Sequence, residues 1–431
     1  MSTTTTRPAT SAATNKRVLI ASLMGSSIEW FDYFLYATTA ALVFNKVFFP
    51  TTDPMVGLML SYLTFSLTFF IRPLGGFIFA HIGDRIGRKK TLVITLSLMG
   101  GATVLIGLLP GYDQIGIWAP ILLILLRLVQ GLGIGGEWGG ALLLAYEYAP
   151  QNRKGLFGSV PQMGVTIGML LATLAITVMS TLPDDQFLAW GWRVPFLLSA
   201  VLVFLGLWIR KGIDETPAFK QAKATGNVAK MPLVETLRYH WRAVLVAVAI
   251  KFVETAPFYI FSTFIVSYAT SSLGFDRISA LNAVTLATLL TTLMIPIMGR
   301  ISDSIGRKRM FVIGTLIMAA FTFPYFMLLE QRTTTTLVIA TVVGLGLVWA
   351  PITAVLGTLF SEIFSTRVRY TGITLGYQIG AALAGGTAPL LATWLLKTYD
   401  GSWVPVAWYI IGTAVISLIG IACAKTVADN D

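Results

Sequence analysis

GDRIGRKK, residues 83–90, is followed 219 residues later by a similar segment, SDSIGRKR, at residues 302–309. Each copy comes directly after a long apolar run, and six such runs lie on each side of one polar stretch. A membrane protein built from two equivalent halves can rock them about a site at the middle of the bilayer. The repeat therefore favours a transporter over a receptor or a membrane enzyme.

The apolar runs are long enough to span a membrane, because about 20 apolar residues cross its hydrocarbon core. We place the spans near 17–44, 56–80, 91–110, 117–145, 156–181, 191–210, 240–269, 279–299, 310–329, 334–360, 372–397 and 402–424. The composition agrees, since 55% of the residues are hydrophobic and only 12% are charged. The predicted fold is an all-α membrane protein with twelve transmembrane helices in two pseudo-symmetric six-helix bundles.

The same pattern divides the chain into parts. The first fifteen residues are rich in Thr and Ser and lack the apolar core and cleavage site of a signal peptide, so we interpret them as a disordered tail. The predicted parts are a cytoplasmic tail (1–15), an N-terminal bundle (16–211), a cytoplasmic linker (212–239), a C-terminal bundle (240–425) and a second cytoplasmic tail (426–431).

Basic residues are concentrated at one end of the predicted bundles. The first tail and the exits of the even-numbered spans hold 23 Lys and Arg residues, whereas the opposite loops hold five. Cytoplasmic loops collect Lys and Arg, so both termini are predicted to be cytoplasmic. The net charge of +11 is thus explained by topology, and its spread over separate segments argues against a nucleic-acid partner. A single cysteine, Cys423, offers no internal disulfide or zinc site, and we predict no cofactor.

Several longer motifs resemble a known family. The Asp-Arg-x-Gly-Arg-Lys pattern at 84–89, with a weaker copy at 303–308, is similar to the loop motif of the major facilitator superfamily. The segments EWFDYFLY (29–36), RPLGG (72–76), GDRIGRK (83–89), RLVQGLGIGGEWGG (127–140) and GWRVPF (191–196) look like those of its metabolite:proton symporters. Two peripheral stretches, 38–50 and 185–199, look most like the shikimate carriers.

This resemblance implies a proton-coupled symporter of a small organic solute, acting as a monomer among the lipids of a bacterial cell membrane. The branch includes carriers of shikimate, α-ketoglutarate, citrate and proline or betaine. The chain departs from the superfamily pattern at Ala80, where a glycine is usual, although Gly299 is kept in the second copy.

Charged residues inside the predicted spans mark the candidate site, because a charge at the bilayer centre costs roughly 2.5–3.5 kcal/mol on insertion scales. The first span carries Glu29 and Asp32, and the helical period places both on one side with Tyr33 and Tyr36. The fourth span carries Arg127. These side chains are expected to face a cavity between the bundles.

Our leading hypothesis is that Asp32 takes the coupling proton and that Arg127 is its partner. Protonation would release the guanidinium to bind a substrate carboxylate. The alternative is a permanent ion pair that joins the first span to the fourth. Proton-coupled sugar carriers of the resembled superfamily pair an acid and an arginine at matching places, which favours the first reading. Glu29, one turn nearer the cytoplasm, is an alternative proton site.

The other candidates are expected to orient a substrate through hydrogen bonds or charge. Lys251 and Glu254 lie one turn apart and can neutralise each other, or Lys251 can point into the cavity as a second cation. The predicted substrate-binding residues are Arg127, Gln130, Tyr33, Tyr36, Gln162, Lys251, Glu254, Tyr377 and Gln378.

The repeated loops are predicted to gate the cytoplasmic side. Asp84 can accept from backbone N–H groups at the start of a helix and from Arg153 or Arg88. Asp303, Glu362 and Arg369 can repeat this arrangement, with a weaker second latch because Ser304 replaces Arg85. The predicted gating residues are Gly83, Asp84, Arg85, Gly87, Arg88, Glu147, Arg153, Asp303, Gly306, Arg307, Glu362 and Arg369.

The sequence as a whole predicts a carrier that imports an organic anion, such as shikimate or a related carboxylate, together with a proton. The alternatives are a zwitterion such as proline or betaine, whose ammonium would meet Glu29 or Glu254, and a dicarboxylate or tricarboxylate. A cavity that keeps a net positive charge favours the anion, and a balanced cavity favours the zwitterion.

Overall fold

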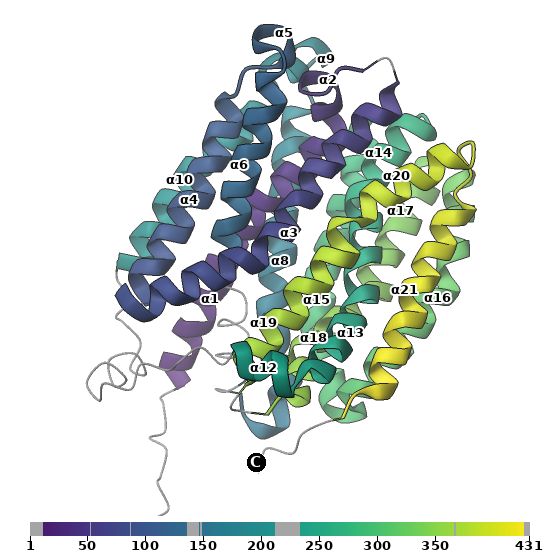
Figure 1. Ribbon diagram of the computed structural model, residues 1–431. Coiled ribbons are helices and arrows are strands. Elements are labelled where there is room, and N and C mark those ends of the chain that lie inside the picture. The colour runs from purple at the N-terminus through teal and green to yellow at the C-terminus, as the bar shows by residue number, and fades with distance from the viewer. Residues whose placement is uncertain are drawn as a thin grey trace, which may run out of the picture.

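The computed structural model describes residues 12–51, 53–86, 88–135, 146, 149–211, 233–365 and 368–425. This part of the chain is helical and contains no strand. Figure 1 shows long helices running side by side across the molecule, with the first half of the chain on one side and the second half on the other. The predicted all-α fold with two bundles is confirmed.

The N-terminal bundle contains the first six spans. They are α1 (Ala12–Thr39) continued by η1 (Ala40–Phe44) and α2 (Asn45–Val47), then α3 (Pro54–Ile86), α4 (Arg88–Leu108), α6 (Trp118–Ile134), α8 (Lys154–Met179) and α10 (Arg193–Lys211). Short helices connect them: α5 (Tyr112–Ile115), η2 (Gln151–Arg153), α9 (Asp184–Gln186) and η3 (Phe187–Gly191).

The C-terminal bundle follows α12 (Leu233–Tyr239). Its first span consists of α13 (Trp241–Tyr259), η4 (Ile260–Phe264), α14 (Ile265–Ser267) and η5 (Tyr268–Ser272). The next two spans are α15 (Arg277–Ile305) and α16 (Arg307–Glu330), and the fourth consists of α17 (Thr334–Thr341), η6 (Val342–Trp349) and α18 (Ala350–Ile363). The fifth consists of α19 (Arg369–Gly380), η7 (Ala381–Gly386) and α20 (Ala388–Thr398), and the sixth is α21 (Val404–Cys423). Nine helices of the described chain are long and apolar enough to cross a membrane, and two shorter apolar ones coincide with the third and fourth spans.

The two ends of the molecule differ in their connections. We call the end that bears α2, α5 and α9 the outer end, and the end where α12 lies and α21 finishes the inner end (Figure 1). The sequence predicts that the inner end faces the cytoplasm. At this end Gly306 joins α15 to α16 with a φ of 93°, a conformation that residues with a Cβ rarely adopt. This explains the glycine of the second loop motif.

The two bundles meet along two seams that the internal repeat relates. In the first, which we call the tight seam, α8 packs on α15. A Cβ on Gly299 would lie 2.8 Å from the carbonyl oxygen of Gly155 and 2.6 Å from Oγ of Ser159. Such distances leave no room for a side chain, so the two helices touch backbone to backbone.

The second, which we call the grooved seam, places α3 against α19, η7 and α20. Ser66 donates a hydrogen bond to the carbonyl oxygen of Gly386, and the Tyr62 hydroxyl lies 2.7 Å from Oγ of Ser267 on α14.

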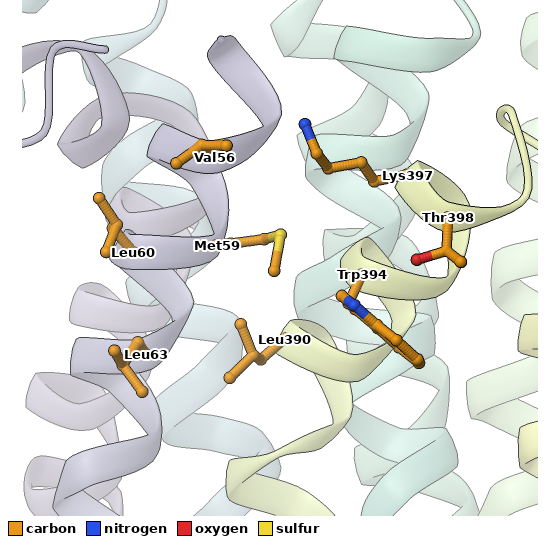
Figure 2. Close-up of a pocket in the computed structure, with 8 residues that line it drawn as sticks. All are labelled: Val56, Met59, Leu60, Leu63, Leu390, Trp394, Lys397 and Thr398. Carbon is orange, nitrogen blue, oxygen red and sulfur yellow. The ribbon is translucent and has the colours of Figure 1, made fainter.

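Toward the outer end, a cavity of about 520 Å³ opens between α3 and α20. Figure 2 shows Met59 and Leu390 pointing into this space. Its lining residues are Val56, Met59, Leu60, Leu63, Leu390, Trp394, Lys397 and Thr398. None of the predicted substrate-binding residues is among them, so this groove is not the candidate site.

Candidate functional site

The Asp32 carboxyl group is fully buried in the N-terminal bundle. Ser199 on α10 donates its hydroxyl to Oδ1 at 2.6 Å, and the Thr103 hydroxyl on α4 also lies near the carboxyl group. Oδ2 has no hydrogen-bond partner in the described part of the chain. A buried carboxyl oxygen without a donor is a place where a proton can bind.

The Arg127 guanidinium, on α6, is also fully buried, and the groups that it contacts most closely, Gln130 and Tyr36, are neutral. Nη1 donates to Oε1 of Gln130 at 2.5 Å, and the guanidinium lies 3.6 Å from the centre of the Tyr36 ring. Gln130 in turn donates to the Thr103 hydroxyl at 2.7 Å. Tyr36 is held by a 2.6 Å hydrogen bond with Thr64.

Among the described residues, no ion pair joins Asp32 to Arg127, so the expected direct pair is wrong for this structure. The physical reason is that each group has another partner, Ser199 on α10 for Asp32 and Gln130 on the same helix for Arg127. Gln130 connects Arg127 to Thr103, whose hydroxyl donates to the carbonyl oxygen of Met99 and lies near the acid.

Arg72, on α3, is a buried cation that the sequence reasoning missed. Its side chain is 1% exposed, and its guanidinium lies 4.4 Å from the ring centres of both Tyr33 and Phe69 and 5.5 Å from that of Trp30. The sequence does contain a signal for it, because Arg72 lies inside an apolar span, where a charged side chain is costly. As part of the RPLGG segment, Arg72 indicates only the family.

Lys251 and Glu254 form an ion pair within α13, which is the intrahelical pair that their spacing allowed. The Lys251 ammonium also lies 3.7 Å from the centre of the Tyr377 ring. Thr255 and Thr353 donate to the two Glu254 oxygens at 2.7 and 3.1 Å. The acid is therefore well satisfied.

Two glutamines connect the bundles. Gln162 on α8 donates to the Thr353 hydroxyl on α18 at 2.9 Å, and Gln378 on α19 donates to the carbonyl oxygen of Gly135 at 3.5 Å. In the described chain, Oε1 of each glutamine is buried without a donor. Both amides can therefore accept a hydrogen bond from a ligand hydroxyl.

Aromatic rings from both bundles close the interior. The Tyr33 ring centre lies 6.4 Å from that of Tyr259 on α13, and Phe65 and Phe69 of α3 lie 5.4 and 5.5 Å from the same ring. All nine predicted substrate-binding residues are buried, whereas Glu29 is only partly buried. The structure thus gathers them inside the molecule, where the two bundles meet.

The interior carries more positive than negative charge. Between the two ends of the bundles, the buried charged residues of the described chain are Arg72, Arg127, Lys251, Asp32 and Glu254. Three cations and two ionised acids give a formal charge of +1, and protonation of Asp32 would raise it to +2. A site of this sign favours an anionic ligand.

Family comparisons cover nearly the whole chain. Residues 18–238 match the "Sugar (and other) transporter" family, and residues 248–429 match the "Major Facilitator Superfamily". The chain belongs to the major facilitator superfamily. The resemblance inferred from the motifs is confirmed, and the protein is a membrane transporter and not an enzyme.

Individual relatives of this facilitator are bacterial transporters. The chain is 40% identical over 405 residues to the shikimate transporter of Escherichia coli, covering 93% of this chain and 92% of that protein. It is 34% identical over 423 residues to a proline/betaine transporter of Salmonella typhimurium, covering 95% and 84%. A crystal structure of a D-xylose-proton symporter superimposes with a TM-score of 0.74 at 18% identity, covering 97% and 99%, and it supports the fold.

At the inner end of this facilitator, Asp303 of α15 caps the start of α8 in the other bundle. Its carboxylate accepts from the backbone N–H groups of Gly155 and Leu156 at 2.7 and 3.2 Å. Arg307 donates to the same carboxylate at 2.8 Å and lies 3.6 Å from Glu362. We call this arrangement the inner latch; it has the acid-to-helix geometry that the loop motif predicted.

The remaining predicted gating residues are placed only in part. Arg369 is buried and donates from Nε to the carbonyl oxygen of Phe364 at 3.2 Å, and Arg153 is exposed. Gly83, Asp84, Arg85 and Arg88 lie in helical backbone, but their side chains are outside the described part, as are Gly87 and Glu147 altogether. The Asp84 latch therefore stays a prediction.

Two ion pairs join the bundles at the outer end of the facilitator. Arg277, at the start of α15, donates to Asp184 at 3.0 Å and to the carbonyl oxygen of Ser180 at 3.2 Å. Lys397, at the end of α20, pairs with Asp53, just before α3. The first pair belongs to the tight seam and the second to the grooved seam.

Proposed function

We propose that this chain is a symporter that carries a small organic carboxylate together with a proton, and that shikimate is the first candidate. The observation that carries the proposal is the buried Asp32 carboxyl group, which has one oxygen without a hydrogen-bond partner in the described chain and shares the interior of the N-terminal bundle with the buried Arg127. The 40% identical shikimate transporter supports the substrate class.

Proton and substrate are coupled in this scheme through electrostatics. An ionised Asp32 opposes the approach of a carboxylate, and protonation removes that repulsion. For charges about 8 Å apart at an effective dielectric constant of about 20, the change is about 2 kcal/mol, or roughly 30-fold in affinity. Coupling of this kind is reciprocal, so a bound carboxylate also favours the proton.

The test uses Asp32→Asn in proteoliposomes with labelled shikimate. The variant is expected to keep exchange of substrate across the membrane but to lose accumulation driven by a pH gradient, because the neutral amide mimics the protonated acid. Asp185→Asn, an exposed acid of α9, is the matched control and should retain both activities. Unchanged gradient-driven accumulation by Asp32→Asn would exclude this role.

A zwitterionic substrate is the second candidate, because the proline/betaine transporter of Salmonella typhimurium is 34% identical. The interior charge argues against it, since Glu254 is already occupied by Lys251, Thr255 and Thr353. Competition of labelled shikimate uptake by betaine, proline, α-ketoglutarate and citrate would separate these classes. Strong competition by betaine alone would favour the zwitterion.

A further inference from the structure

Arg72 is the buried cation that the scheme above leaves without a role. Among the described residues, its Nε and Nη2 have no hydrogen-bond partner, although the side chain is 1% exposed. The two acids of the interior are engaged elsewhere, Asp32 by Ser199 and Glu254 by Lys251. The guanidinium therefore rests on aromatic faces with N–H groups unsatisfied.

Aromatic packing alone does not compensate for this burial. Desolvating an ion costs more free energy than a contact with an aromatic face recovers. Each buried N–H group without an acceptor adds a further cost. A packing role between Tyr33 and Phe69 requires no charge. A carboxylate ligand would supply both the missing acceptors and the missing negative charge.

Arg127 lies near the same ring. Its guanidinium carbon lies 5.4 Å from the Tyr33 ring centre, and that of Arg72 lies 4.4 Å from it, so the two carbons are at most 9.8 Å apart. Nε and Nη2 of Arg127 are also without partners in the described chain. Bidentate N–H···O bonds of 2.7–2.9 Å place a carboxylate carbon roughly 4 Å from a guanidinium carbon, so one carboxylate contacts both arginines when their carbons lie within about 8 Å of each other, inside this upper bound.

We propose that Arg72 and Arg127 together hold the carboxylate of the transported substrate, beside the Tyr33 ring, and that Arg72 restricts transport to carboxylates. The inference rests on the proposed function and names the ligand group that this site recognises. Arg72 comes from α3 and Arg127 from α6, so the N-terminal bundle supplies both cations.

The acceptors nearby identify the rest of the ligand. Gly135 packs directly on the Arg72 backbone, where a Cβ would lie 2.1 Å from the Arg72 carbonyl oxygen, and Gln378 donates to the Gly135 carbonyl. The Gln378 Oε1 lacks a donor in the described chain, and the Gln378 amide is thus held next to the backbone of Arg72 on α3. An acceptor here suits a ligand hydroxyl. The substrate class is therefore a hydroxylated carboxylate.

The experiment measures equilibrium binding of shikimate and of its neutral carboxamide to purified, detergent-solubilised protein. The unaltered protein should bind the acid roughly 100-fold more tightly than the amide. Arg72→Gln should weaken acid binding roughly 100-fold and amide binding less than about threefold, so that the preference for the charged form disappears. Arg72→Lys keeps the charge but not the fork of donors, and should weaken acid binding about tenfold.

Arg193→Gln is the matched control. Arg193 is a partly buried arginine that donates to the carbonyl oxygens of Gly107 and Leu109 at the outer end. Its loss should lower thermal stability and leave the ratio of acid to amide affinity unchanged. A purely structural Arg72 would behave in the same way.

The possible outcomes separate the two proposals. An unchanged ratio in Arg72→Gln overturns the role of Arg72. If that variant does not fold, unchanged acid affinity in Arg72→Lys overturns it, and so does an unaltered protein that binds amide and acid equally. If the unaltered protein binds betaine and no carboxylate, the proposed function itself fails, whatever the variants show.

Discussion

At the tight seam, Gly155 and Gly299 allow α8 and α15 to touch backbone to backbone, whereas at the grooved seam a groove of about 520 Å³ opens between the outer parts of α3 and α20. The internal repeat relates the two seams, yet the first brings backbone against backbone and the second brings Gly386 against the Phe69 side chain. Close-packed interiors transmit displacement with little compression. We infer from this difference that the bundles pivot along the tight seam and that the grooved seam changes shape.

The polar contacts at the ends of the two seams also differ in how far they are buried. The inner latch of the tight seam uses a carboxylate that is 5% exposed and accepts from two backbone N–H groups of a helix start. At the outer end of the grooved seam, the side chains of the Lys397–Asp53 ion pair are 40% and 42% exposed. Exposed pairs contribute little and are screened by salt, so the buried inner latch is the stronger of these two contacts.

The largest effect is expected from Gly299→Leu. The new Cβ would lie 2.8 Å from the Gly155 carbonyl oxygen, and the backbone there cannot give way cheaply. Overpacking costs about 1–3 kcal/mol, so uptake by reconstituted protein should fall at least about tenfold. Leu390→Phe in the groove is the control and should change uptake less than about twofold. Equal losses in both variants would remove the distinction between the seams.

A smaller effect is expected from Asp303→Asn. The amide keeps the size of the acid but loses the charge that favours the start of α8 and binds Arg307, which is worth up to about 2 kcal/mol in a partly buried site. Spin labels at the exposed Asn152 and Ile305 should report a longer distance, with uptake reduced several-fold. Asp185→Asn should leave the distance unchanged. A distance that stays short in Asp303→Asn would show that packing alone closes the inner end.

The smallest effect is expected from Lys397→Gln at the grooved seam. The hydrogen bond from Lys397 holds the pKa of the Asp53 carboxyl group below its ordinary value. The pair is therefore complete above the usual carboxyl range and is lost only as the pH falls through the lowered pKa. Uptake by this variant should stay within about twofold of the unaltered protein between pH 5 and 8, and the difference should vanish in about 1 M salt. A large effect that persists in high salt would place a strong tie at this seam.

The spans and the repeat could be predicted because hydropathy and local spacing determine them. The Lys251–Glu254 pair followed from a separation of three residues on one helix. The partner of Asp32 could not be predicted in this way, since Ser199 lies 167 residues away and meets it only through the packing of α10 on α1. Helical spacing gives the face of a helix but not the neighbour that this face meets. The same limit hid the stacking of Arg72 on Tyr33.

If Asp32 takes the coupling proton as proposed, this buried carboxyl group also determines how the membrane voltage acts on the carrier. One proton on Asp32 and one monocarboxylate beside the arginines add no net charge to the moving protein. An electric field performs about 2.3 kcal/mol of work per elementary charge per 100 mV, and on this cargo it performs none. A zwitterion carried with the same proton would be driven by voltage, so the electrical behaviour of uptake reports the chemistry of the solute directly.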